Sequence, residues 1–198
     1  TVDTETKGDV FIIRLYSFSA ISPNLFREAL REFVESGKYK LIIDLRGNPG
    51  GYLEAANDMA SWFLPLGKVV VKEDFKKEED AQIFRSKGYN IFSDKLKLIV
   101  LIDGGSASAS EILAGALREH GIATLVGAQS FGKGSVQELI EITSDTSLKV
   151  TIAQWLTPNG NSISHGGLTP DVVVKLDEEE FKKGNDTQLL KALEILSK

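Results

Sequence analysis

The chain has 198 residues, of which 42% are hydrophobic and 26% are charged, a composition typical of a folded globular protein. Its formal net charge of -5, with acidic and basic residues interspersed, gives no basic surface for nucleic acid or for an anionic membrane. It contains no cysteine, which excludes disulfides, thiol catalysis and zinc-thiolate sites, and none of its apolar runs approaches membrane-spanning length.

The amino-terminal part of the chain predicts a strand, a helix and a second strand. Residues 10–16 are β-branched and aromatic, which is typical of a strand. Ser22 and Pro23 predict the start of a helix, in which apolar residues recur at helical spacing until Gly37 ends it. Residues 41–45 form a short apolar run, as in a strand buried on both faces, so we expect a parallel sheet.

A glycine-rich turn and an irregular segment follow. Residues 46–51 combine glycine, asparagine and proline, and we expect a helix after them over 53–64. Residues 69–71 predict a short strand. Residues 72–95 mix charges with scattered aromatic side chains and show no clean period, so we interpret them as a surface excursion or flap.

The second half of the chain continues the alternation of strands and helices. Residues 143–147 resemble a hairpin turn, residues 158–170 form a polar loop, and Asp186 or Thr187 is expected to cap the last helix. The predicted strands are 98–103, 123–127, 135–142, 148–156 and 172–176, and the predicted helices are 110–120 and 188–196. With no internal repeat and no obvious linker, this alternation indicates one α/β domain over residues 1–198.

The stretch GGSASASE at residues 104–111 lies between a buried strand and a helix. A serine in such a turn lies near a helix amino terminus, which stabilises negative charge and so favours a nucleophile.

A serine of this kind needs a base, and the two histidines, His120 and His165, are expected to be solvated rather than catalytic. We therefore consider Lys133, which has a glycine on each side. A lysine acts as a general base only where burial or nearby positive charge lowers its pKa from about 10.4 toward neutrality. Gly-Lys-Gly alone is more typical of an exposed or phosphate-binding loop.

Several motifs together resemble the successive blocks of the C-terminal processing (tail-specific) serine proteases. The blocks occur in that family's order and cover nearly the whole chain. They are DLRGNPGG at 44–51, GSASASEI at 105–112, FGKGSVQ at 131–137, TPNG at 157–160 and LTPD at 168–171. The resemblance implies an α/β fold with a crotonase/ClpP-like core of repeated strand-strand-helix units and a C-terminal helix. It also implies a serine endopeptidase that cleaves polypeptides near apolar C-terminal tails.

The resemblance also implies the roles of individual residues. Ser108 corresponds to the nucleophile, Lys133 to the base, and Gln137 to the residue that orients the lysine. The backbone N–H groups of Ala109 and of a glycine in the 48–51 turn would form the oxyanion hole, with Gly51 preferred over Gly50. No metal and no cofactor are expected.

Other polar residues near these motifs have simpler structural explanations. Ser110 is expected to begin the helix and Ser106 to hydrogen-bond within its own turn. Glu111 and Arg46 are interpreted as structural charges at the ends of elements. Asp103 ends the central strand, but a carboxylate beside a lysine would raise the pKa of the amine, which argues against its contact with the base.

The family comparison also sets expectations about what surrounds this core. The PDZ domain that commonly precedes it in the family has no counterpart in the sequence, so we expect either an excised core or a shorter family member. Residues 72–95 correspond in position to a variable insertion. A PDZ domain, a regulatory partner or oligomerisation outside this chain would fit the family, and an extracytoplasmic location is implied although no signal peptide is present.

Two alternative functions remain open. A noncatalytic relative of the family would bind an apolar ligand, as retinoid-binding modules do, or act as a scaffold. A crotonase-type acyl-CoA enzyme would also use paired backbone amides for an oxyanion, but no acidic residue follows the Gly50-Gly51 turn in an obviously catalytic place, and the serine and lysine would have no role.

Overall fold

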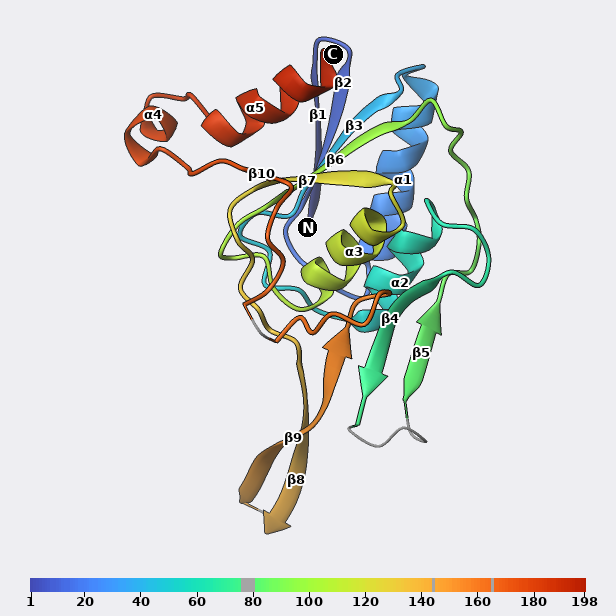
Figure 1. The fold of residues 1–198 in the computed structure, drawn as a ribbon, viewed down its shortest axis with the longest axis vertical. Coiled ribbons are helices and arrows are strands. Elements are labelled where there is room, and N and C mark those ends of the chain that lie inside the picture. The colour runs from blue at the N-terminus through green and yellow to red at the C-terminus, as the bar shows by residue number, and fades with distance from the viewer. Residues whose placement is uncertain (76–80, 144, 165) are drawn as a thin grey trace.

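The computed structural model describes residues 1–75, 81–143, 145–164 and 166–198, and it has a six-stranded sheet, a four-stranded sheet and five helices among them (Figure 1). The six-stranded sheet has the order β1-β2-β3-β6-β7-β10, and all its neighbouring pairs except β1-β2 are parallel. Its strands are β1 (Val2–Lys7), β2 (Val10–Leu15), β3 (Lys40–Asp44), β6 (Lys97–Ile102), β7 (Ala123–Gly127) and β10 (Val172–Val173).

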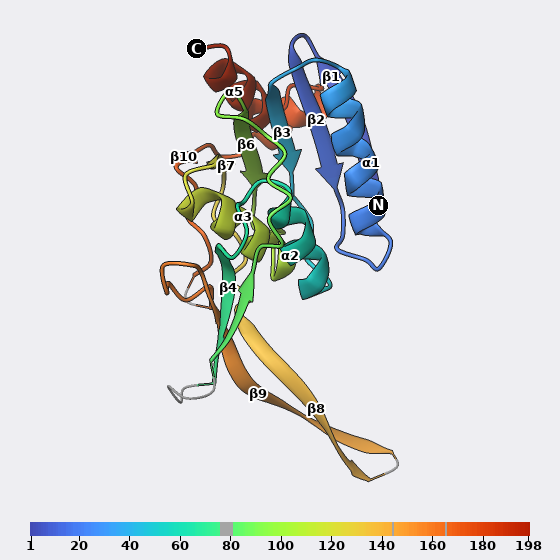
Figure 2. The same ribbon diagram turned by 90° about the vertical axis from the view of Figure 1, so that its right-hand side faces the viewer.

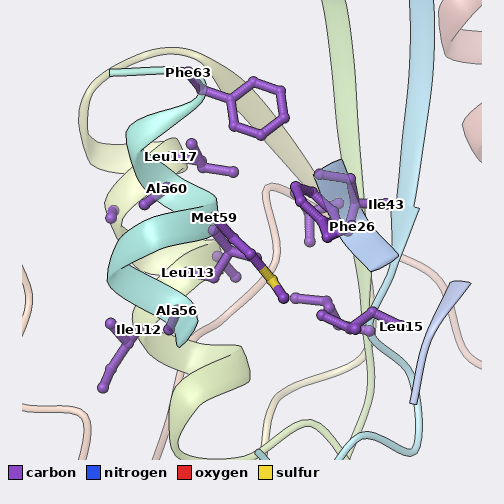
Figure 3. Close-up of a cluster of buried hydrophobic side chains, with 14 of the residues drawn as sticks. Leu15, Phe26, Ile43, Ala56, Met59, Ala60, Phe63, Ile112, Leu113 and Leu117 are labelled. Atoms are coloured by element: carbon purple, nitrogen blue, oxygen red, sulfur yellow. The ribbon is translucent and has the colours of Figure 1, made fainter. Parts of the chain in front are cut away.

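Helices cover both faces of this sheet. The strands β3 and β6 are apolar nearly throughout, so that successive side chains enter two different cores. Ile43 and Val100 contribute to the larger core with helices α1 (Ser22–Glu35), α2 (Leu53–Ser61) and α3 (Ala109–Glu119), while Ile42 and Ile99 pack with α5 (Thr187–Leu196). Figure 3 shows the larger core, where Met59 and Phe26 lie between the helices and the sheet.

The four-stranded antiparallel sheet has the order β5-β4-β9-β8 and lies at one end of the first sheet (Figure 2). It consists of β4 (Val69–Asp74), β5 (Gln82–Arg85), β8 (Ser135–Thr143) and β9 (Thr146–Leu156). The distal part of the β8-β9 hairpin projects away from the rest of the molecule. The hairpin predicted around residues 143–147 is therefore confirmed, although residue 144 lies outside the described residues.

The interpretation of 72–95 as an irregular excursion is wrong in part. Residues 72–74 extend β4 and residues 82–85 form β5, which pairs with β4; residues 76–80 lie outside the description. The strand β1 and the five-residue helix α4 (Glu178–Lys182) have no counterpart among the predicted elements, and β10 is shorter than predicted. The predicted cap of the last helix is confirmed, because the Asp186 side chain accepts a hydrogen bond from the Leu189 N–H.

Candidate active site

Ser108 lies at the junction where the strand β6 has ended and the helix α3 begins at Ala109. It is the N-cap residue of α3 and is half-buried. Its backbone has φ 56° and ψ -115°, a conformation that residues other than glycine rarely adopt. Strain of this kind costs about 1 to 3 kcal/mol and persists only where the surrounding structure enforces it. The hydroxyl is thereby presented at the amino terminus of a helix, where negative charge is stabilised.

The two neighbouring serines use their hydroxyls in the interior. Ser106 is fully buried, and its Oγ donates to the Leu45 carbonyl at 2.8 Å and accepts from the Asp103 N–H at 2.9 Å. Ser110 is also fully buried, and its Oγ donates to the Asn48 carbonyl at 3.0 Å. Ser108 is therefore the accessible hydroxyl of the three, and the structural interpretation of Ser106 agrees with these bonds.

The glycine turn after β3 packs directly against Ser108. A Cβ placed on Gly50 would lie 2.5 Å from the Ala107 carbonyl oxygen and 2.9 Å from both the Ser108 Cβ and the Ala109 nitrogen. Only glycine allows this approach, and the φ of +94° at Gly50 favours it as well. The two segments that are far apart in the sequence are thus in contact beside the candidate nucleophile.

The predicted oxyanion donors are the backbone N–H groups of Ala109 and Gly51, and in the described part of the chain neither has an acceptor. The Gly50 N–H, in contrast, donates to Asn48 Oδ1 at 2.9 Å. Ala109 is the first residue of α3, where an N–H has no intrahelical acceptor. Gly51 is held by a bridge to Phe18, in which the Phe18 N–H and the Tyr52 N–H make the hydrogen bonds. Gly51 therefore stays the predicted donor in this turn.

A buried carboxylate, that of Glu111, connects the serine turn to the lysine loop. Its Oε2 accepts from the Ser108 N–H at 2.8 Å and from the Lys133 N–H at 3.0 Å. Its Oε1 accepts from Ser130 Oγ at 2.5 Å and from the Gly132 N–H at 2.7 Å, and the residue is only 1% exposed. Sequence analysis interpreted Glu111 as a charge at a helix end. The Ser-x-x-Glu spacing from Ser108 was a signal for part of its role, because that pattern places a carboxylate on the N-cap backbone.

The side chains of Lys133 and Gln137 are not assembled with Ser108. Both side chains are exposed, and in the described part of the chain no hydrogen bond links either of them to the serine. Gln137 lies on β8, opposite Thr151 of β9. The burial that a lysine base requires is thus absent in this arrangement, although the backbone of Lys133 is bound to the same carboxylate as the backbone of Ser108.

Two further acidic side chains fix the turns around the site. Asp103 Oδ1 accepts from the N–H groups of Gly47 and Gly105, each at 2.8 Å, and so joins the turns that follow β3 and β6. Glu119, at the other end of α3, accepts from Thr157 Oγ1 at 2.7 Å and from the Asn159 N–H at 2.7 Å, which anchors the loop after β9.

Arg46 joins the glycine turn to the last helix. It donates to Asp44 and, through Nη1 at 2.9 Å and Nη2 at 2.7 Å, to both oxygens of Asp186. Burial alone would lower the pKa of Arg46, but the hydrogen bonds that it donates to the Asp44 and Asp186 carboxylates raise its pKa above the usual value. For the carboxyl group of Asp186, burial has the opposite effect and raises the pKa. The hydrogen bonds that it accepts from Arg46 and from the Leu189 N–H outweigh the effect of burial, so the pKa of Asp186 lies below its usual 3.8.

Among the described residues, His120 gives no alternative base. His120 Nε2 lies 2.7 Å from the Val69 carbonyl oxygen, so it joins the end of α3 to β4. His165 lies outside the described residues. Within the described ranges no three acidic, histidine or cysteine side chains come together as metal ligands, and none of the helices there is long and apolar enough to cross a membrane.

The sequence of residues 9–174 matches the family described as Peptidase family S41. A carboxy-terminal-processing protease of Bartonella bacilliformis is 40% identical over 95% of this chain and 44% of its own length. A probable CtpA-like serine protease of Staphylococcus aureus strain N315 is 34% identical over 98% of this chain and 41% of its own length. The chain thus spans less than half the length of these curated relatives.

Solved structures agree with this comparison. The photosystem II D1 C-terminal processing protease superposes with a TM-score of 0.77 at 30% identity, over 84% of this chain and 42% of that one. Mature CPAF in complex with lactacystin has a TM-score of 0.72 at 14% identity, over 99% and 54% of the two chains, which is a likeness of fold.

Proposed function

Because the chain belongs to peptidase family S41, we propose that it is the catalytic domain of a serine endopeptidase that cleaves polypeptides near their carboxyl termini. The observation that supports this proposal best is the geometry at Ser108. Its hydroxyl is the accessible one of three, on a backbone with φ 56° at a helix amino terminus. Strained serine turns of this kind serve to expose a nucleophile above a sheet.

In the proposed reaction Ser108 Oγ attacks the scissile carbonyl carbon while the neutral Lys133 amine takes the hydroxyl proton. The Ala109 and Gly51 N–H groups donate to the oxyanion, and each such donor is worth roughly 3 kcal/mol. As the C–N bond breaks, the Lys133 ammonium returns its proton to the leaving amine, which leaves an ester on Ser108. Water then attacks the ester carbonyl carbon while Lys133 takes one of its protons, and the Lys133 ammonium returns that proton to Ser108 Oγ as the acid is released. Gln137 would orient the lysine by a hydrogen bond.

This mechanism requires Lys133 to change its surroundings. The exposed side chain must approach Ser108, and its amine must lose contact with water, before it can act as the base at neutral pH. Bound substrate that covers the start of β8 would do both. A PDZ domain or another regulatory partner of the longer protein would have the same effect, and we propose such a partner for this core.

The remaining parts of the proposal concern context. We propose that residues 1–198 form one catalytic domain with a crotonase/ClpP-like core, supported by the mainly parallel sheet, the second small sheet and the helix α5. An apolar carboxyl-terminal tail as substrate, oligomerisation and an extracytoplasmic location follow from the family resemblance. Cell fractionation would test the location.

The decisive experiment compares the wild-type protein with Ser108→Ala and Lys133→Met on a peptide with an apolar carboxyl terminus, with products identified by mass spectrometry. Lys149→Met is the matched control, because Lys149 is an exposed lysine on β9, outside the candidate site. We expect both site variants to lose activity by at least about 10³-fold and the control to retain it. Undiminished cleavage by Ser108→Ala would refute the proposal.

A second candidate function is a noncatalytic relative that binds an apolar ligand or acts as a scaffold. The exposure of Lys133 and Gln137 is the observation that favours it. Tight ligand binding without turnover, in a protein restored to the length of its relatives, would support this alternative, whereas trapping of an ester on Ser108 would exclude it.

A further inference from the structure

A cavity of about 670 Å³ opens beside the candidate active site, between the start of α1 and the outer side of α2. This volume is typical of sites for small ligands and single side chains. Three aromatic residues, Tyr52, Trp62 and Tyr89, form much of its wall, together with Ser19 and Pro23. Among the residues described, none that the proposed reaction uses lines this cavity.

Two short steps of backbone connect the cavity to the proposed oxyanion hole. Gly51 is bridged to Phe18, and the residues that follow them, Tyr52 and Ser19, both line the cavity. Consecutive Cα atoms are 3.8 Å apart, so the cavity begins one residue from Gly51 on its own segment and one residue from Phe18 on the neighbouring segment. A polypeptide bound at the Gly51 N–H, which faces away from Phe18, would lie beside Tyr52, and a long side chain would extend past this residue to the cavity.

Two of the three aromatic side chains, Trp62 and Tyr89, are held in place by contacts within the chain, whereas Tyr52 is exposed. The rings of Trp62 and Tyr89 lie 4.6 Å apart between centroids. Asp58 accepts hydrogen bonds from the Tyr89 hydroxyl at 3.0 Å and from Lys87 Nζ at 2.5 Å, which fixes the loop that carries the tyrosine. A preformed wall of this kind lowers the entropic cost of binding a rigid apolar group.

The polar and charged groups of the cavity indicate a neutral ligand with hydrogen-bond acceptors. Arg27 and Lys87 are balanced by Glu54 and Asp58, so no net charge selects an ionic side chain. Trp62 Nε1 and Ser19 Oγ are two of four buried side-chain atoms in the described structure that have no hydrogen-bond partner. Buried groups without partners are rare, and a small movement of these two side chains would offer their N–H and O–H to a peptide carbonyl.

We propose that this cavity is a substrate subsite that takes an aromatic or large aliphatic side chain of the polypeptide, with Trp62 and Ser19 donating to a carbonyl of the same segment. The inference rests on the proposed function, because it assumes an extended polypeptide at Ser108. It adds a specificity element: a bulky apolar residue close to the cleaved bond, in addition to any apolar tail.

Binding can be measured without turnover, because Trp62 is one of only two tryptophans in the chain. In a Trp155→Phe variant, which keeps Trp62 alone, we expect a blocked alanine pentapeptide with a central phenylalanine to give a saturable change in emission. The all-alanine pentapeptide should bind about tenfold more weakly or not at all. Tyr89→Ala in the same background should weaken phenylalanine peptide binding by a similar factor, while Tyr39→Ala, an exposed tyrosine outside the cavity, should not.

Equal responses to the two peptides, or an unchanged affinity in Tyr89→Ala, would overturn the inference. Binding of the phenylalanine peptide only when its carboxyl terminus is free would also overturn it, in favour of a site for a terminal carboxylate. Since this assay requires no catalysis, it separates failure of the subsite from failure of the protease proposal. If the wild-type protein binds the phenylalanine peptide in the cavity but cleaves no peptide, only the protease proposal is refuted.

Discussion

Replacement of Glu111 by glutamine tests whether one carboxylate holds the serine turn and the lysine loop together. The two oxygens accept four hydrogen bonds, two on each oxygen. A glutamine of the same shape has one oxygen and one NH₂ group, so two donors lose their acceptor and face another donor. If the NH₂ group turns toward Ser130, that hydroxyl rotates to accept, and the Gly132 N–H alone is left without a partner.

The magnitude follows from the number of bonds that are lost. A hydrogen bond to a charged group contributes about 1.5 to 3 kcal/mol, and a buried donor without an acceptor costs a similar amount. We therefore expect Glu111→Gln to lower the free energy of unfolding by about 2 to 4 kcal/mol. Displacement of the two loops should lower kcat/KM by at least about tenfold, since each 1.4 kcal/mol of lost transition-state stabilisation is a factor of ten.

The assay combines chemical denaturation with peptide hydrolysis, and the same helix provides a control. Glu119 also accepts three hydrogen bonds, from Thr157, Asn159 and Asn161, but at the opposite end of α3. Glu119→Gln should reduce stability by less, because its hydrogen bonds are partly exposed to water, and should leave kcat largely unchanged. A folded Glu111→Gln variant with wild-type kcat/KM, or equal losses of kcat in both variants, would refute the assigned role of Glu111.

Three further predictions concern the turns, the acid stability and the lysine. Gly50→Ala should destabilise the fold by about 2 kcal/mol or more in denaturant titrations, because residue 50 has a positive φ and the added Cβ would meet Ala107 and Ser108. Gly104→Ala is the control and should cost less than about 0.5 kcal/mol, because the space around Gly104 is open. Asp186→Asn should lower Tm at pH 7, and the difference in Tm from the wild type should vanish in acid. The pKa of Asp186 is depressed in the folded protein, so its carboxylate stabilises the fold above about pH 3.8 and this stabilisation is lost as the pH falls further. Lys133→Met should leave Tm unchanged, since the side chain is exposed. If lysine is the base, the rate of peptide hydrolysis by the wild-type protein should rise with pH, and a rate independent of pH from neutral to alkaline would argue against it.

The interior strands could be predicted because their sequence and their environment agree. Runs such as 41–45 and 98–102 are apolar throughout, and the structure buries them on both faces between helices. In contrast, β1 has an apolar residue only at Val2 and is largely exposed, so pairing with β2 rather than apolar burial stabilises it. The strand β5 has only four residues and follows a charged stretch, so its own pattern is too short to indicate a period.

In the candidate site, too, the features that depend on local sequence could be predicted, and those that depend on contacts between distant residues could not. The serine-rich turn could be located because a strand, small residues and a helix follow one another in sequence, an order that places a helix amino terminus there. The choice of Ser108 among its three serines came from the family resemblance. The role of Glu111 depends on contacts with residues 19 to 22 positions later, which no local pattern reports. The cavity beside Tyr52 is even less accessible to sequence reasoning, because α1, α2 and the segment around Tyr89 meet there only in the folded chain.

The contrast between the backbone and the side chain of Lys133 explains how such a site can be both preformed and inactive. Glu111 fixes the Lys133 N–H near the Ser108 N–H, so the two loops need no large movement to act together. The lysine side chain, with several rotatable bonds, is exposed. In the proposed mechanism, a ligand that excludes water from the start of β8 and brings the amine toward the serine would favour the neutral base. The main control of activity would accordingly be substrate bound at Ser108, and rearrangement of the fold would be secondary.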